Sequence, residues 1–335
     1  MGGSSYDRDE YDSSSSSSWG SSYGGSSSTK KSSSASSSGN SSSSSSSRVF
    51  SSSRLDSSML PNNKILESAT KNPIIILLDV TGSNDTFARI VYDKLPMFFG
   101  QIEQKGYLKD FDIAICAVGD AYTDDYPLQI GTFAKGIEID SWISKLVLEG
   151  GGGGQAKESY ELAAYYLLKK AKFAPGSQPI IFFLGDEAPY PTVNKTQAQS
   201  FGIDCPENVS NVFEQLRKKV NDNVFLLLSK YCGSYFDSDI TDAWEKVLAP
   251  QHVIKVGEEK AIIDLMLGII SMVSSTRTLE TYKVDMLNRG QTHARIANVS
   301  SSLDGLSKAL VPVTVTSNIV KSDKTATSTQ KGKRL

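Results

Sequence analysis

An uninterrupted run of apolar residues at 73–78 constrains the fold of this chain most. Apolar positions without alternation indicate a strand buried on both faces, as in a parallel sheet with helices on either side. Comparable runs occupy residues 111–118, 179–184, 224–228 and 252–256. A weaker, more alternating run at 128–133 is typical of an edge strand.

Helical patterns separate most of these runs. Residues 160–171 place apolar or small side chains at i, i+3, i+4, i+7, i+8 and i+11, which is the spacing of one helix face. Residues 86–105 also predict a helix, which Pro96 is expected to kink or divide. Further helices are expected at 207–220, 239–248 and 260–274. The alternation predicts an α/β fold: a doubly wound, mostly parallel, Rossmann-like sheet with helices on both faces.

The two ends of the chain differ from its middle. Residues 1–60 are dominated by serine, a composition that cannot offset chain entropy by burial, so a disordered tail is expected there. This tail is interpreted either as a solubilising tether or as an arm that kinases phosphorylate for binding to a basic partner. We expect one folded domain over residues 71–275. Residues 276–335 are expected to form a partly helical segment and a basic, flexible tail.

Charge and apolar content argue against nucleic acid and membranes as partners, and the cysteine pattern argues against disulfide bonds. The 335 residues contain 35 Lys and Arg against 37 Asp and Glu, so the basic field that nucleic-acid binding requires is missing. No apolar stretch approaches the roughly 20 residues of a spanning helix, and no secretory signal opens the chain, so a cytoplasmic protein without membrane contact is expected. Cys116, Cys205 and Cys232 lack CxxC spacing and are expected to be reduced thiols.

Oxygen-bearing side chains follow the predicted strands, where doubly wound sheets bind their ligands. Asp79, Thr81 and Ser83 come directly after the first strand, Asp120 follows the second, and Asp186 follows the strand at 179–184. Carboxylate and hydroxyl oxygens are the ligands that Mg²⁺ and Mn²⁺ prefer. The two hydroxyl residues also suit turn and capping bonds ahead of the next helix.

Asp79-x-Thr81-x-Ser83 resembles the metal-ion-dependent adhesion site (MIDAS) of von Willebrand factor type A (vWA) domains, in particular their intracellular branch. The resemblance covers about residues 72–275. It implies that Asp79, Thr81, Ser83 and Asp186 hold one divalent cation, Mg²⁺ or Mn²⁺. Further residues that match in order are Gly119-Asp120, Phe133, Gly152-Gly153-Gly154, Glu158-Ser159 and the segment from Leu184 to Pro189.

The glycine-rich segment departs from the family pattern. Intracellular members have an Asp after the three glycines, whereas this chain has Gln155, a neutral amide that is expected to be a weak ligand and to lower affinity for the metal. Asp120, Gly154 and Glu158 are candidates for supporting the metal loops rather than for binding the metal. The glycines lack the Lys-Ser/Thr of a phosphate loop, so they are interpreted as allowing close backbone approach beside the cation.

The resemblance implies an interaction module in which the cation binds an Asp or Glu of a protein partner, in an ATPase or another multisubunit assembly. No catalytic residue is expected. A metal-independent scaffold that recruits partners through its tails is the alternative. A haloacid dehalogenase-like, magnesium-dependent phosphatase is less favoured, because Thr81 stands where that family has its acid. The only histidines, His252 and His293, are expected to be structural or at the surface, which argues against zinc.

Overall fold

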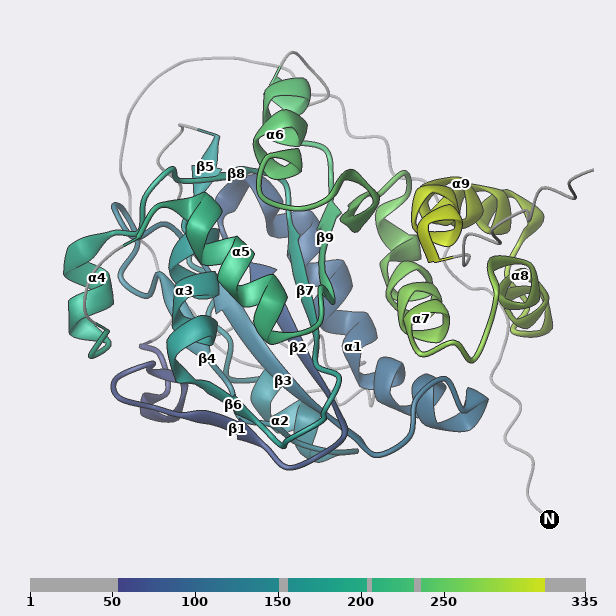
Figure 1. Ribbon diagram of the computed structural model, residues 1–335, viewed down its shortest axis with the longest axis horizontal. Coiled ribbons are helices and arrows are strands. Elements are labelled where there is room, and N and C mark those ends of the chain that lie inside the picture. The colour runs from purple at the N-terminus through teal and green to yellow at the C-terminus, as the bar shows by residue number, and fades with distance from the viewer. Residues whose placement is uncertain (1–53, 151–155, 204–206, 232–235, 311–335) are drawn as a thin grey trace, which may run out of the picture. The chain divides into compact units, whose positions relative to one another are not determined.

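The computed structural model describes residues 54–150, 156–203, 207–231 and 236–310 (Figure 1). Its centre is a six-stranded sheet in the order β10-β9-β7-β2-β3-β4, in which every pair is parallel except β3 with β4. The predicted α/β fold and the predicted edge strand are therefore confirmed. The strands are β2 (Asn72–Asp79), β3 (Phe111–Val118), β4 (Leu128–Ile130), β7 (Ile180–Gly185), β9 (Val224–Leu228) and β10 (Val253–Lys255).

The sheet separates two hydrophobic cores, and β2 contributes to both. Its side chains point alternately to opposite faces, so that Ile74, Ile76 and Leu78 enter one core while Ile75 and Leu77 enter the other. All five side chains are fully buried. This two-sided burial is the physical reason for an apolar run without alternation.

Helices cover both faces of the sheet. One core contains side chains of α1 (Asp85–Lys105), α2 (Glu138–Ile143) and α7 (Ile262–Val273). Pro96 lies within α1, which continues past it as a single helix. The other core contains side chains of the helices α3 (Tyr160–Lys170), α4 (Lys195–Ser200), α5 (Val209–Lys219) and α6 (Phe236–Glu245).

Short elements complete the domain. The strands β1 (Leu66–Ser68) and β6 (Ala171–Phe173) form one two-stranded parallel sheet, and β5 (Lys157–Glu158) and β8 (Ala188–Pro189) form another. Sequence patterns miss these strands because each has only two or three residues and none lies within a longer apolar run.

The described part begins within the segment expected to be a tail. Leu55 and Met59 are 5% and 0% exposed, and Met59 ends a 3₁₀ turn at Ser57–Met59. Lys64 Nζ donates to the carbonyl oxygens of Ser58 and Ile130, each at 2.6 Å, which ties this segment to β4. Residues 54–60 thus belong to the folded domain, because two apolar side chains among the serines are enough to anchor them.

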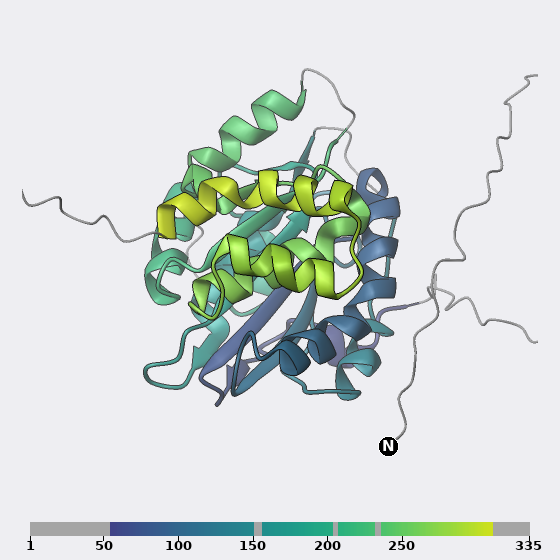
Figure 2. The ribbon, with the colours of Figure 1, turned by 90° about the vertical axis from the view of Figure 1, so that its right-hand side faces the viewer.

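Two helices of the carboxyl-terminal segment, α8 (Leu279–Asn288) and α9 (His293–Leu310), correspond to the helical pattern predicted there. Both lie against α7 (Figure 2), and Tyr282 and Leu303 are fully buried in the same core. A Cβ on Gly268 of α7 would lie 2.5 Å from Leu303 and 2.8 Å from Tyr282, so glycine permits this close packing. Residues 311–335 lie outside the described part.

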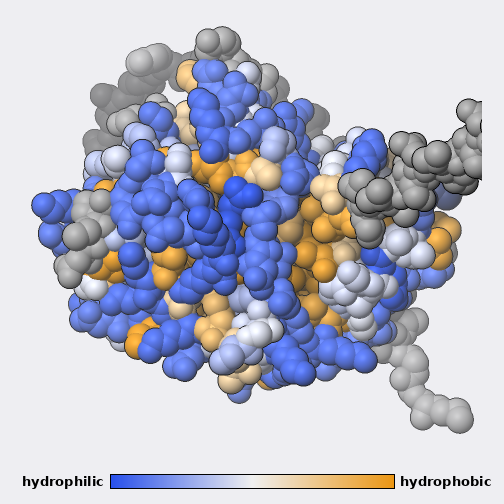
Figure 3. All heavy atoms as spheres, in the orientation of Figure 1, coloured by the Kyte–Doolittle hydropathy of each residue, from blue (hydrophilic) through white to orange (hydrophobic). Residues whose placement is uncertain are grey.

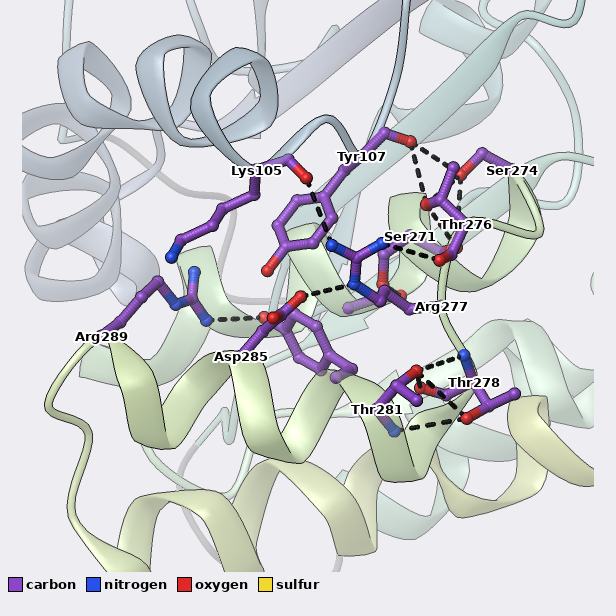
Figure 4. Close-up of polar contacts among 12 residues, drawn as sticks. Lys105, Tyr107, Ser271, Ser274, Thr276, Arg277, Thr278, Thr281, Asp285 and Arg289 are labelled. Carbon is purple, nitrogen blue, oxygen red and sulfur yellow. Dashed lines mark hydrogen bonds and ion pairs between the residues drawn. The ribbon is translucent and has the colours of Figure 1, made fainter.

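The junction between α7 and α8 is held to the end of α1 by polar contacts (Figure 4). Arg277 donates from Nε to Asp285 Oδ2 at 2.6 Å and from Nη2 to the carbonyl of Lys105 at 3.3 Å. Ser274 Oγ donates to the carbonyl of Tyr107 at 2.8 Å. At the other end of α8, Arg289 forms an ion pair of 2.8 Å with Asp264 of α7, and both side chains are only 9% exposed.

The structure bears on three expectations from the sequence, which concern the cysteines, the histidines and membrane-spanning helices. Cys116 is a free, buried cysteine of β3, whereas Cys205 and Cys232 fall outside the described ranges. His252 is buried and His293 begins α9. Within the described residues, no helix combines the length and apolarity needed to cross a membrane.

Candidate metal centre

The carboxyl ends of β2 and β7 bring the predicted metal ligands together. These strands are parallel neighbours, with Leu78 opposite Leu184, so they end at the same edge of the sheet. Asp79 is the last residue of β2, and Asp186 directly follows β7. Ser83 Oγ donates to Asp186 Oδ1 at 3.3 Å. Residues far apart in the sequence therefore meet where a doubly wound sheet carries its ligand site.

The loop after β2 folds around the Asp79 carboxylate. Its Oδ1 accepts hydrogen bonds from the backbone N–H of Thr81 at 2.9 Å and from Thr81 Oγ1 at 2.6 Å. The hydroxyl oxygens of Thr81 and Ser83 lie 3.5 Å apart. Asp79 and Thr81 are buried while Ser83 is exposed, so Ser83 marks the side on which the site meets solvent.

Asn84 ties this loop to the end of β9, which is separated from β2 by β7, a role that the sequence analysis did not identify. Its side-chain amide donates to the carbonyl of Asp79 at 3.0 Å, and its Oδ1 accepts from Ser229 Oγ at 3.2 Å. Ser229 follows β9, the next strand along the same edge. A polar residue in a helix-opening loop is too common a feature to signal this contact by sequence alone.

Tyr160 is a second residue of the candidate site that the sequence analysis missed. It is the first residue of α3, is fully buried, and donates its hydroxyl to Asp79 Oδ2. Gly185 makes room for this contact, because a Cβ at that position would lie 1.9 Å from the Tyr160 hydroxyl and 3.0 Å from Asp79 Oδ2. Aromatic residues at helix starts are ordinarily packing residues, so only the fold reveals the contact.

Asp120 supports a turn next to the site. Its Oδ1 accepts from the backbone N–H of Tyr122 at 3.0 Å, and its Oδ2 accepts from Thr123 Oγ1 at 3.1 Å and from the Tyr190 hydroxyl at 3.3 Å. These bonds engage both carboxylate oxygens. Asp120 thus holds together the turn that follows β3.

Glu158 belongs to β5, beside β8, and its carboxyl group lies close to that of Glu187, the residue after Asp186. Both side chains are almost fully buried. Two buried carboxyl groups at close range disfavour each other's ionisation, and the pKa of each is raised. Gln155 and Gly154, the remaining residues of the predicted set, lie outside the described residues.

Burial makes this group of acids costly to ionise. It raises the pKa of Asp79, and it raises the pKa of Asp186 to about 8 with further contributions from the charges of Asp79 and Glu187. The pKa of Glu158 is also raised, first by burial and then by the charge of Asp79. Within the described part of the chain, no ion pair involves any of these four acids.

The oxygen positions fit a small divalent cation. Asp79 Oδ1, Thr81 Oγ1, Ser83 Oγ and Asp186 Oδ1 form a continuous series with successive separations of 2.6, 3.5 and 3.3 Å. Adjacent ligands of octahedral Mg²⁺ lie about 3 Å apart. Asp186 Oδ2 is buried without a hydrogen-bond partner, and a cation would satisfy it. The four candidate ligands are two carboxylates and two hydroxyls. Among the described residues, no group of three or more Asp, Glu, His or Cys side chains is arranged to hold a metal ion.

Comparison with known proteins finds likeness only among solved structures. Neither a protein-family model nor a curated protein matches the chain. The pilus adhesin SpaC of Lactobacillus rhamnosus GG, in its open conformation, is similar with a TM-score of 0.42 and 12% identity, over 63% of this chain and 31% of the adhesin. Proximal thread matrix protein 1 of the mussel byssus, in a structure with a zinc-occupied MIDAS motif, gives 0.41 and 12%, over 61% and 49%. The chain thus spans about a third and about half of these proteins.

Proposed function

We propose that this chain is a metal-dependent protein-interaction module of the vWA type. In this proposal Asp79, Thr81, Ser83 and Asp186 hold Mg²⁺ or Mn²⁺, and the cation binds an Asp or Glu carboxylate of a protein partner. The observation that carries it is the convergence of four oxygens from two strand ends, with the buried Asp186 Oδ2 unpartnered. When bound, the cation supplies an open coordination position for the incoming carboxylate.

The protein's own residues fix the geometry of that position. Tyr160 and Thr81 orient the Asp79 carboxylate through hydrogen bonds to both of its oxygens. Asn84 holds the loop against the end of β9. The exposed Ser83 leaves one side of the site open to a partner. A preorganised shell of this kind favours binding because little ordering remains to be done.

The proposal assigns no catalytic residue to the site. Both oxygens of Asp79 accept hydrogen bonds within the protein, which suits a fixed ligand rather than an attacking nucleophile. Thr81 occupies the position where a phosphatase of the haloacid dehalogenase kind needs an acid, and a hydroxyl has no usable acid pKa. By sequence resemblance, we propose a cytoplasmic partner within an ATPase or another multisubunit assembly.

Calorimetric titration of the full-length protein with MgCl₂ and MnCl₂ tests the metal site. We expect saturable binding in the wild type, none in Asp79→Ala, and weaker binding in Thr81→Val, which removes a hydroxyl but keeps the side-chain shape. Asp304→Ala is the matched control, because Asp304 lies on α9 and, among the described residues, pairs with Lys308 at the surface. Equal binding by all four well-folded proteins would remove the proposed ligand set.

A further inference from the structure

A cleft of about 710 Å³ adjoins the candidate metal centre, and Asp186 lines both. The cleft lies between α6 and α9, where residues that follow β9 and β10 also line it. Figure 3 shows this face of the domain, on which orange, apolar patches lie among blue, hydrophilic residues. Its volume falls in the range of ordinary ligand sites. The apolar residues that line the cleft are Leu228, Ile240, Val253 and Val256.

One side of the cleft comes from α9, which lies beyond the residues that resemble a vWA domain. Asn298, Ser301 and Ser302 of this helix line the cleft. Ser302 Oγ donates to the carbonyl of Lys255 at 2.8 Å, which anchors α9 to β10. Asn298 packs on Gly257, where a Cβ would lie 2.5 Å from its side-chain nitrogen. The cleft is thus built from contacts particular to this chain.

Two lysines give the cleft its positive groups. Lys230 and Lys255 are exposed, and neither forms an ion pair with another described residue. Asp186 and Asp237 balance them, and Asp237 Oδ1 already accepts the backbone N–H of Tyr231 at 3.0 Å. A divalent cation held by Asp79 and Asp186 would neutralise both of these carboxylates, so the two lysines would outweigh Asp237 by one positive charge. That charge is complementary to an acidic ligand.

We propose that the cleft binds an acidic peptide segment of the partner protein that carries two carboxylates. The first carboxylate binds the cation, so this inference rests on the proposed function, and the second pairs with Lys230 or Lys255. Apolar lining residues accommodate the side chains between the two carboxylates. The hydroxyls of Ser301 and Ser302 lie where the polar peptide backbone passes along α9. Selectivity then depends on the spacing of acids in the partner as well as on the metal.

Fluorescence anisotropy with labelled, end-blocked Gly/Ser peptides tests this inference on the full-length protein in the presence of MgCl₂. One peptide carries a single Asp, and the others carry a second Asp at increasing separations. We expect the best two-Asp peptide to bind roughly three- to tenfold more tightly than the single-Asp peptide. This gain should be lost in Lys230→Ala or Lys255→Ala while single-Asp binding stays unchanged. Lys195→Ala is the control, because Lys195 is exposed on α4, away from the cleft.

The outcomes separate the two proposals. If calorimetry on the same samples shows no Mg²⁺ binding, the proposed function fails and this inference fails with it. If Mg²⁺ binds but the second Asp adds nothing at any separation, only the inference is overturned. The inference alone is also overturned if the two-Asp peptide still binds more tightly than the single-Asp peptide in both lysine variants. A gain that shrinks with added NaCl, as screened charges require, supports it.

Discussion

The Tyr160 hydroxyl donates a hydrogen bond to Asp79 Oδ2 and thereby joins the first turn of α3 to the end of β2. Tyr160 lies at a T-shaped angle to Trp244 and Phe183, with ring centroids 5.1 and 6.2 Å away. The ring is therefore fixed by aromatic packing, with its hydroxyl directed at the Asp79 carboxylate. The most buried acid of the candidate site depends on a residue outside the MIDAS pattern.

Tyr160→Phe removes this hydroxyl and leaves Asp79 Oδ2 buried without its donor. We expect the free energy of unfolding to fall by about 1–3 kcal/mol in metal-free protein, because an unsatisfied buried acceptor pays its full desolvation cost. Urea unfolding measures the change. Tyr122→Phe is the control, since the Tyr122 side chain is 57% exposed, and it should unfold like the wild type. Equal stability of both variants would show that the contact contributes nothing.

Gly185→Ala places a Cβ against the Tyr160 hydroxyl and Asp79. Because backbone and ring must shift to relieve the overlap, we expect a loss of about 1–3 kcal/mol in unfolding free energy and weaker Mg²⁺ binding. Gly100→Ala in α1 is a matched control with open space around the new Cβ. It should stabilise the protein by up to about 1 kcal/mol through helix propensity. Thermal unfolding and calorimetry would distinguish the two.

Affinity for Mg²⁺ should depend on pH through Asp186. Its pKa is raised to about 8 by burial and neighbouring charge, so at neutral pH the metal must displace a proton. Affinity should rise as pH increases towards 8 and level off above it. Calorimetry in buffers of different ionisation enthalpy counts the released protons. A pH-independent affinity without proton release would contradict this reading.

The raised pKa of Asp186 has the opposite effect on the stability of the metal-free protein, which should fall as pH rises. A carboxyl whose folded pKa lies above its unfolded value, about 3.9, stabilises the fold below that value and loses the contribution as pH rises. Stability without metal should therefore decrease between about pH 4 and pH 8. Saturating Mg²⁺ should reduce this decrease, because the cation favours the ionised form. Asp186→Asn, which cannot titrate, should show a smaller decrease in chelator.

Gln155→Asp introduces a carboxylate where the vWA pattern that this sequence resembles has one. We expect Mg²⁺ affinity to increase on the order of tenfold, because ligand charge strongly tunes such oxygen sites. Gln155→Asn is the control, since it has the same length as Asp without the charge. Parallel calorimetric titrations compare the two variants. Equal affinities would show that residue 155 does not contribute to the metal site.

The sequence alone determined the sheet and the polar residues at its edge. The two-sided burial of β2 requires an apolar run, so the pattern at 73–78 could be interpreted without any tertiary information. The rule that parallel strands end at one edge placed Asp79 and Asp186 on that edge. Local periodicity and this topological rule were sufficient for these features, whereas the pairing of the two acids as ligands of one cation came from the resemblance to vWA domains.

Only the tertiary structure decided what surrounds those predicted ligands. Tyr160 and Gly185 meet at Asp79 because α3 packs on the end of the sheet, and no local pattern encodes that contact. Met59 is buried although its neighbours resemble a solvated tail, because burial depends on what a side chain packs against. The cleft exists because α9 returns to β10 from far along the chain. Sequence periodicity does not reveal such long-range packing, because it shows only which positions of one helix or strand lie on the same face.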